Sequence, residues 1–165
     1  MVVVEDGRIA AIGTRTASEL PPGVNIRNFP GGMLAPAFFD VHIHGAAGHD
    51  VMEGTPPALS CVGKFLASRG TGAFLATTVS AAVDVTLQSL EGLARVIAQG
   101  PVEGEAKPIG IHLEGPFLSH GKRGAHPENR LLPPDIGLFD RMVEAAEGYV
   151  RLITLAPELP GTQAQ

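Results

Sequence analysis

The sequence predicts an α/β fold built around a parallel sheet. Apolar runs begin near Ala37, Ala73, Pro108 and Tyr149, and intervals of roughly 35–40 residues suit βα units of about 30 residues or more. The segments between these runs follow the helical period and carry start and stop signals. Alternating strands and helices favour parallel strands joined by right-handed crossovers.

The first 35 residues have a different pattern, with short strands joined by turns. Val2–Val4 and Arg8–Ile12 flank an Asp-Gly pair, which is a strong hairpin signal. We expect a further short strand near Val24–Phe29. This segment is too small to bury a core alone. The predicted organisation is therefore a partial small β-domain over residues 1–35 and an α/β domain over residues 36–165.

Three helices are expected in the second region. Thr55 can cap the first, with Pro56 at its first helical position, where the missing N–H costs nothing. Ser80 can cap the second, which the pair at 100–101 (Gly-Pro) then stops. The third is expected around residues 135–147, because its apolar residues follow the helical period.

A sheet of this kind is either doubly wound or part of a (β/α)8 barrel. Neither GxGxxG nor GxxxxGK[ST] follows the first strand, which weakens a nucleotide-binding interpretation. Four βα units are half of a barrel, and a whole barrel typically takes about 250 residues. On the barrel interpretation, the chain stops partway through the fold.

Composition excludes several classes of partner. The hydrophobic fraction of 44% and charged fraction of 18% are those of a soluble globular protein. The net charge of −5 argues against nucleic-acid binding. No apolar run is long enough for a membrane span, and the N-terminus does not resemble a signal peptide. The single cysteine, Cys61, makes the reducing cytoplasm the expected compartment.

The first candidate site is the pair His42 and His44. Residues two apart on a strand share a face, so both imidazoles project together, with Asp40 behind them. Two imidazoles at the carboxyl end of a strand can bind one divalent cation. The alternative is a pair of histidines merely hydrogen-bonded near a turn.

The second candidate is Glu114, which shares a strand face with His112. A carboxylate projecting from a buried parallel strand is costly unless something pairs with it, and a metal ion would do so. A salt-bridged glutamate is the plainer interpretation.

The third candidate is the loop of residues 119–126. Lys122 and Arg123 could donate charge-assisted hydrogen bonds to an anionic substrate group. A solvated basic turn is the alternative.

These motifs together resemble one known family. Residues 34–45 (LAPAFFDVHIHG) resemble the first barrel strand of the amidohydrolase superfamily. Residues 112–118 (HLEGPFL), followed by residues 122–126 (KRGAH), are similar to the diagnostic stretch of N-acetylglucosamine-6-phosphate deacetylases. Residues 70–78, residues 154–158 and the opening segment resemble further parts of that family, in the right order.

The resemblance implies a fold, a reaction and site residues. The fold would be the first half of a (β/α)8 TIM-like barrel, preceded by part of a small β-sandwich domain. The reaction would be metal-dependent hydrolysis of the acetamide of N-acetylglucosamine 6-phosphate, giving glucosamine 6-phosphate and acetate. Glu114 would be a metal ligand, and Ala125 with His126 would lie at the sugar-phosphate site. His42 and His44 match a pair that supports a second metal ion in some members. The expected cofactor is a divalent ion, Zn²⁺.

The resemblance also implies what the chain lacks. The general base of the family is expected beyond Gln165, so no residue of this chain is predicted to be catalytic and the isolated chain is expected to be inactive. The partner is expected to be a small amino-sugar phosphate, and the full-length form a homodimer. Two other functions remain open: another amidohydrolase, such as a dihydroorotase-like imidase, and a non-catalytic half-barrel that binds a partner.

Overall fold

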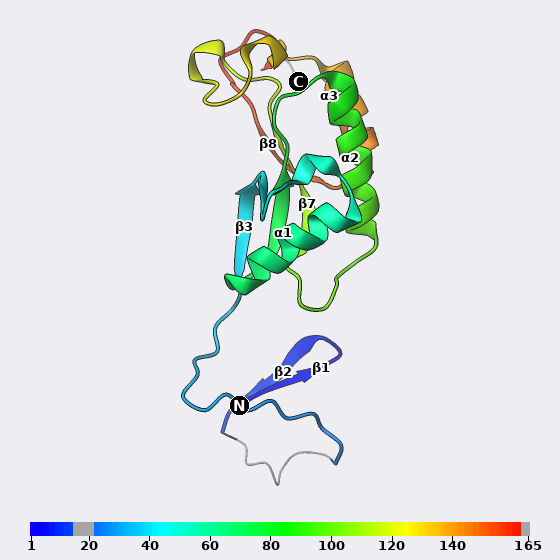
Figure 1. Ribbon diagram of the computed structural model, residues 1–165. Coiled ribbons are helices and arrows are strands. Elements are labelled where there is room, and N and C mark those ends of the chain that lie inside the picture. Colours follow the sequence, from blue (N-terminus) through cyan, green and yellow to red (C-terminus); the bar gives the residue numbers. More distant parts are fainter. Residues whose placement is uncertain (15–21, 163–165) are drawn as a thin grey trace. The chain divides into compact units, whose positions relative to one another are not determined.

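The computed structural model describes residues 1–14 and 22–162 of the chain. It divides into two compact units, Met1–Ala35 and Pro36–Gln165. Each unit has its own pattern of secondary structure (Figure 1).

The N-terminal unit contains the predicted hairpin. Strands β1 (Val2–Glu5) and β2 (Arg8–Ile12) pair antiparallel. Asp6 and Gly7 both have positive φ, at 49° and 72°, as a type I′ turn requires. The strand predicted at residues 24–29 is wrong, because these residues are irregular and exposed. They have no strand partner in the described part of this unit, and an apolar run without a partner does not form a sheet.

The second unit contains a four-stranded parallel sheet, which confirms the predicted α/β class. Its strand order, β3-β6-β7-β8, follows the order of the sequence. A doubly wound sheet reverses its direction of growth at a switch point, whereas this sheet grows in one direction only, as a barrel does. The strands are β3 (Phe38–Ile43), β6 (Thr71–Thr77), β7 (Lys107–Glu114) and β8 (Val150–Thr154).

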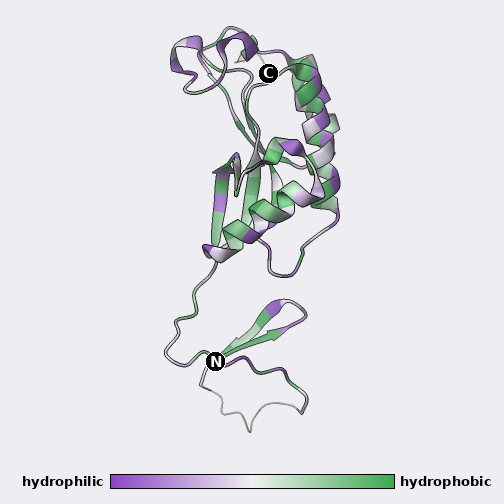
Figure 2. Cartoon of the chain, viewed as in Figure 1, coloured by the Kyte–Doolittle hydropathy of each residue, from purple (hydrophilic) through white to green (hydrophobic). Residues whose placement is uncertain are grey.

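Helices connect the strands at the predicted places. They are α1 (Pro56–Ser68), α2 (Val83–Ala98) and α3 (Ile136–Ala145). Short elements fill the loops: β4 (Gly45–Ala46), β5 (His49–Asp50), η2 (Val51–Glu53), η3 (His120–Lys122) and η4 (Glu128–Arg130). Hydrophilic residues gather on the segment of η3 and η4 (Figure 2).

Two helices begin with a side-chain cap, as predicted for Thr55, and one does not. Thr55 accepts a hydrogen bond from the Ala58 N–H at 3.4 Å, and Asp135 accepts one from the Leu138 N–H at 3.0 Å. The prediction that Ser80 caps α2 is wrong, because α2 begins after Ala82 without a side-chain cap. The Ser80 hydroxyl instead lies 2.9 Å from Nδ1 of a distant histidine, His126.

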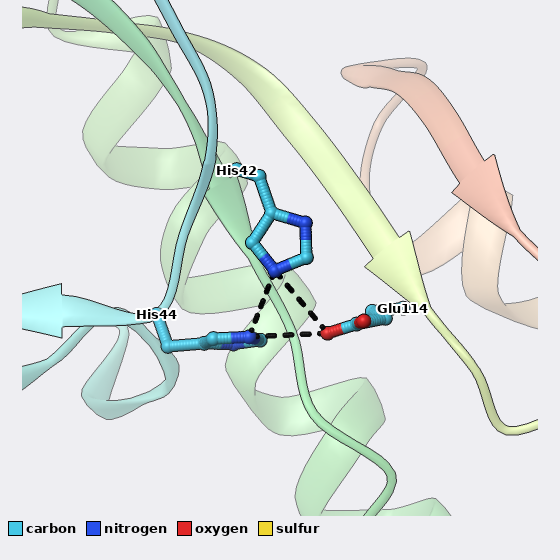
Figure 3. Close-up of side chains that lie close together, drawn as sticks. All are labelled: His42, His44 and Glu114. Atoms are coloured by element: carbon cyan, nitrogen blue, oxygen red, sulfur yellow. Dashed lines mark hydrogen bonds and ion pairs between the residues drawn. The ribbon is translucent and has the colours of Figure 1, made fainter. Parts of the chain in front are cut away.

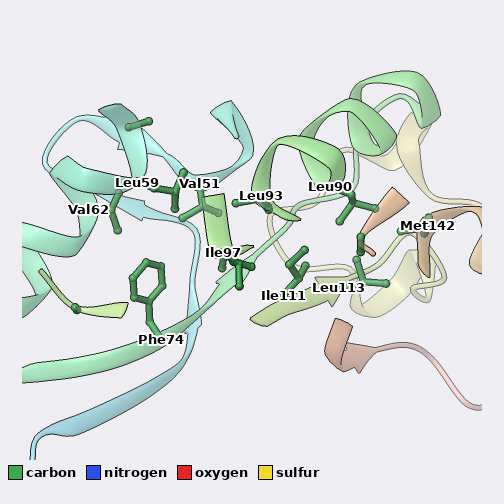
Figure 4. Packing of buried hydrophobic residues seen from close by; sticks show 14 of the residues in the cluster. Val51, Leu59, Val62, Phe74, Leu90, Leu93, Ile97, Ile111, Leu113 and Met142 are labelled. Atoms are coloured by element: carbon green, nitrogen blue, oxygen red, sulfur yellow. The ribbon is translucent and has the colours of Figure 1, made fainter. Parts of the chain in front are cut away.

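The core lies between the helices and one face of the sheet. Phe74 and Ala76 of β6 and Ile111 and Leu113 of β7 are buried against the helices. Because alternate residues of a strand face opposite sides, the residues that follow them in sequence lie on the other face. Figure 4 shows this packing, with Leu59, Val62, Leu90, Leu93, Ile97 and Met142 on the helical side.

Among the described residues, no helix has the length and apolar character needed to cross a membrane.

Gly92 of α2 packs against the main chain of Gly54, which precedes α1. A Cβ atom at Gly92 would collide with the main chain of Gly54, so the Gly92→Ala variant must push the two segments apart. Although alanine favours helix by about 1 kcal/mol, we expect G92A to lower the free energy of unfolding by about 1–3 kcal/mol.

Urea denaturation measures this difference. The control is Val85→Ala on the same helix, whose side chain is 47% exposed and whose replacement is expected to change stability by less than about 0.5 kcal/mol. A G92A variant as stable as the unsubstituted chain would contradict the prediction.

Candidate metal centre

The sheet topology brings the predicted histidine pair and the predicted glutamate together. His42 lies in β3, His44 follows the end of that strand, and Glu114 is the last residue of β7. Strand β6 lies between the two strands, and all three run parallel, so their carboxyl ends share one edge. Figure 3 shows the three side chains pointing toward one another across this edge.

The three side chains converge on one carboxylate oxygen. Oε2 of Glu114 lies 3.0 Å from Nε2 of His44 and 3.5 Å from Nε2 of His42. The two Nε2 atoms are 3.2 Å apart. One ligand atom from each residue thus falls within 4.8 Å of the other two. This group of His42, His44 and Glu114 is called the triad below.

The protonation of His44 follows from its hydrogen bond to the main chain. Its Nδ1 lies 3.1 Å from the carbonyl oxygen of Thr77. A carbonyl oxygen only accepts, so Nδ1 carries a proton and donates it. In the neutral ring, Nε2 then carries a lone pair and is an acceptor. It faces the Glu114 carboxylate, which is also an acceptor. The contact is favourable only with a cation or a further proton between the two atoms.

A third histidine contacts the same carboxylate oxygen. Nε2 of the buried His126 lies 3.2 Å from Oε2 of Glu114. Its Nδ1 faces the main-chain N–H of Ser80 at 3.2 Å, and that N–H can only donate. Nδ1 is therefore the acceptor, and Nε2 carries the proton and donates to Glu114. His126, predicted at the sugar-phosphate site, thus holds the carboxylate of the triad in place.

Ser80 had no place in the site predicted from sequence. Its main-chain N–H and its hydroxyl both lie within hydrogen-bond distance of Nδ1 of His126, which is 46 residues away along the chain. A serine near the start of a helix predicts an N-cap. Nothing in the neighbouring sequence predicts that it contacts a distant histidine.

His112 is the buried neighbour of the triad. Its ring nitrogens lie 3.3 Å from Oγ1 of Thr77 and 2.8 Å from Oγ1 of Thr154. Burial lowers the pKa of His112 below 6.5, and the nearby His42 lowers it further, while Glu114 acts in the opposite direction. The neutral ring is therefore favoured.

In the basic loop, Arg123 contacts neighbouring residues, and anion binding by Lys122 and Arg123 stays a prediction. Arg123 pairs with Glu128 at 3.1 Å and donates to the carbonyl oxygen of His120 at 2.7 Å. Lys122 and Ala125 are exposed. The loop brings His126 to the triad, whereas Arg123 is engaged within the loop.

Comparison with curated proteins confirms the resemblance noted in the sequence. The chain is 34% identical over 159 residues to an N-acetylglucosamine-6-phosphate deacetylase of Bacillus subtilis, covering 95% of the chain and 40% of that protein. It is 33% identical to an N-acetylgalactosamine-6-phosphate deacetylase of Escherichia coli O157:H7, covering 96% of the chain and 40% of that protein. No family model matches the chain.

Solved structures agree. A crystal structure of N-acetyl-D-glucosamine-6-phosphate deacetylase from Mycobacterium smegmatis superposes with a TM-score of 0.81 at 31% identity, covering 99% of this chain and 40% of that one. A mutant of the same enzyme in complex with N-acetyl-D-glucosamine-6-phosphate has a TM-score of 0.77 at 33% identity, over 95% of this chain and 39% of that one. The chain therefore matches the N-terminal part of these enzymes and spans about 40% of their length.

Gly115, which follows the triad glutamate, is expected to be irreplaceable. It has a φ of +82°, and a Cβ atom there would collide with Oγ of Ser80. We expect Gly115→Ala to lower the free energy of unfolding by about 2 kcal/mol or more, because strain of about 1 kcal/mol or more adds to the steric conflict.

Gly124→Ala separates the two causes. Gly124 also has a positive φ, +61°, but a Cβ atom there meets nothing within 4 Å. Equal losses of stability in the two variants, measured by thermal and urea unfolding, would show that the Ser80 contact contributes nothing.

Proposed function

We propose that this chain is the part of an N-acetylglucosamine-6-phosphate deacetylase that holds a divalent metal ion, Zn²⁺, in the triad. The reaction of the whole protein would be hydrolysis of the acetamide of N-acetylglucosamine 6-phosphate to glucosamine 6-phosphate and acetate. The proposal is supported by the similarity to relatives with this name, over about 40% of their length, and by the geometry of the triad.

One contact carries the proposal. The lone pair of His44 Nε2 faces a carboxylate oxygen of Glu114 at 3.0 Å, and two acceptors at this distance repel each other unless a cation or a proton lies between them. A shared cation removes the repulsion and satisfies both groups.

The donor set and its spacing fit zinc. Imidazole nitrogen and carboxylate oxygen are both common zinc ligands. Two ligand atoms bound at about 2.0–2.1 Å in a tetrahedral arrangement lie roughly 3.3–3.4 Å apart. The three separations in the triad are 3.0, 3.2 and 3.5 Å. Three protein ligands also leave a position open, as catalytic rather than structural zinc sites do.

The residues around the triad have distinct roles in this proposal. When bound, the metal ion lowers the pKa of a water molecule and polarises the amide carbonyl. His126 donates to Glu114 and keeps the carboxylate turned toward the two histidines. The Thr77 carbonyl keeps the Nε2 lone pair of His44 directed at the triad. Such outer partners fix ligand orientation and tautomer.

Further assignments rest on the resemblance alone. Ala125 and His126 are proposed to contact the sugar phosphate, and the loop that carries them reaches the triad through His126. No residue of this chain is assigned as the general base. The homodimeric form and the cytoplasmic location stay predictions.

N-acetylgalactosamine 6-phosphate is a second candidate substrate. The relative from Escherichia coli O157:H7 is named for this sugar, and its identity of 33% is almost that of the Bacillus subtilis relative, 34%. The two sugars differ only in the configuration of one hydroxyl, so the acetamide chemistry is the same.

Zinc content tests the triad in the 165-residue chain itself. After incubation with Zn²⁺ and dialysis, we expect about one tightly bound ion per chain by elemental analysis. Glu114→Gln removes the ligand charge at nearly constant shape, and His44→Gln removes an imidazole. Each is expected to raise the Kd by more than the 10–100-fold that the loss of an outer partner causes.

The matched control for zinc binding is His120→Gln. His120 is exposed and pairs with Glu128 at 3.5 Å, outside the triad, so zinc content should not change. Stoichiometric zinc in the E114Q variant would refute the proposed ligand set.

Acetate release tests the reaction in a polypeptide that contains this chain and has the full length of the relatives. We expect a higher kcat/KM for N-acetylglucosamine 6-phosphate than for the galactose isomer, and a loss of at least about 100-fold in the E114Q variant because the metal ion is no longer held. The reverse preference would favour the second candidate. No acetate from either sugar would overturn the proposed function.

A further inference from the structure

A chain of hydrogen bonds crosses all four strands of the parallel sheet beside the triad. The Ile43 N–H donates to Oγ1 of Thr77 at 3.0 Å. Oγ1 of Thr77 lies 3.3 Å from Nδ1 of His112, and Nε2 of His112 lies 2.8 Å from Oγ1 of Thr154. These four residues come from β3, β6, β7 and β8 respectively, so the chain has one member in each strand.

This network of hydrogen bonds supplements the main-chain pairing at the end of β3, where His42 and His44 lie. The pairing of β3 with β6 shifts register between Asp40 and Ile43, and His42 falls inside this interval. The N–H of Ile43 is satisfied by the Thr77 hydroxyl. The end of β3 is thus held to the sheet by a side-chain hydrogen bond at Ile43 in addition to its pairing with Ala76.

Thr77 holds this strand end in two ways. Its hydroxyl accepts from the Ile43 N–H, and its carbonyl oxygen accepts from Nδ1 of His44. It is fully buried, with 0% of its surface exposed, so water does not replace these bonds. The first bond fixes the position of the end of β3 relative to β6, and the second fixes the orientation of the His44 ring.

His112 connects the same network to the strand of the glutamate. It precedes Glu114 by two residues on β7 and therefore lies on the same face. Its ring is 1% exposed, and both of its nitrogens have threonine partners, on β6 and on β8. The ring also packs edge-on against His42, with centroids 5.1 Å apart.

We propose that Thr77 and His112 are positioning residues that hold His42 and His44, at the end of β3, in register with Glu114 of β7. The proposal rests on the proposed metal site. It adds that these two residues keep the metal ligands at the right separation in the metal-free protein. Neither residue is a ligand; each acts through the strand end or the ring that it holds.

Zinc affinity of the 165-residue chain tests this proposal. Thr77→Val keeps the shape and the carbonyl oxygen but removes the hydroxyl, whereas Thr77→Ser keeps the hydroxyl. We expect T77V to raise the zinc Kd by about 10–100-fold, the usual effect of losing an outer partner of a metal site. T77S is expected to stay within about threefold. An unchanged Kd in T77V would overturn the proposal.

Amide hydrogen exchange of Ile43 in the metal-free chain gives a readout that does not depend on zinc. We expect the Ile43 amide to exchange at least about tenfold faster in T77V than in T77S, because its hydrogen-bond acceptor is gone. If the unsubstituted chain binds no zinc, the proposed function fails, and this exchange difference still decides the positioning role. Equal exchange in the two variants would overturn it.

Thr154→Val tests the far end of the chain and protects against a T77V variant that does not fold. Thr154 is exposed and its side chain contacts His112 rather than the triad, so we expect the variant to fold, which urea unfolding checks. We expect its zinc Kd to rise about tenfold, with Thr154→Ser unchanged. A T154V variant that binds zinc as tightly as T154S would remove His112 from the proposal.

Discussion

The carboxylate of Glu114 is the group around which the rest of the site is arranged. One of its oxygens faces ring nitrogens of His42, His44 and His126 at 3.5, 3.0 and 3.2 Å. A partly buried carboxylate is costly without partners, and these partners come from two separate segments, the end of β3 and the loop that carries His126. Only the parallel alignment of β3, β6 and β7 brings them to one edge, so the chemistry of the site depends on the register of the sheet.

The two faces of the sheet have different roles: one packs against the helices in the core, and the other carries the polar side chains of the site. On one face, Phe74, Ala76, Ile111 and Leu113 are buried against the helices. On the other, Thr77, His112 and Glu114 form polar contacts. Because strand side chains alternate, Ala76, Ile111 and Leu113 are each followed by a polar residue on the face of the site. The core thereby holds the strand ends in place without occupying the space of the ligands.

Local signals were reliable wherever the relevant contact is local. Thr55 and Asp135 cap helices because the N–H groups that they accept from are three residues away. The Asp-Gly hairpin formed for the same reason. Ser80 does not cap α2; its hydroxyl is hydrogen-bonded to His126, which is 46 residues away along the chain. The apolar stretch at residues 24–29 formed no strand, since a strand needs a neighbour that the local sequence does not specify.

By itself, the sequence determined the α/β class, the hairpin, the places of the four parallel strands, and which residue types could bind a metal ion. Periods of two and 3.6 residues and capping motifs act over a few residues, so they can be read without a fold. The tertiary structure decided which nitrogens carry protons, which serine holds His126, and how Thr77 and His112 link the strands. These features depend on pairs of atoms separated by 33 to 46 residues, and the positions of such pairs follow from strand register and packing rather than from any local pattern.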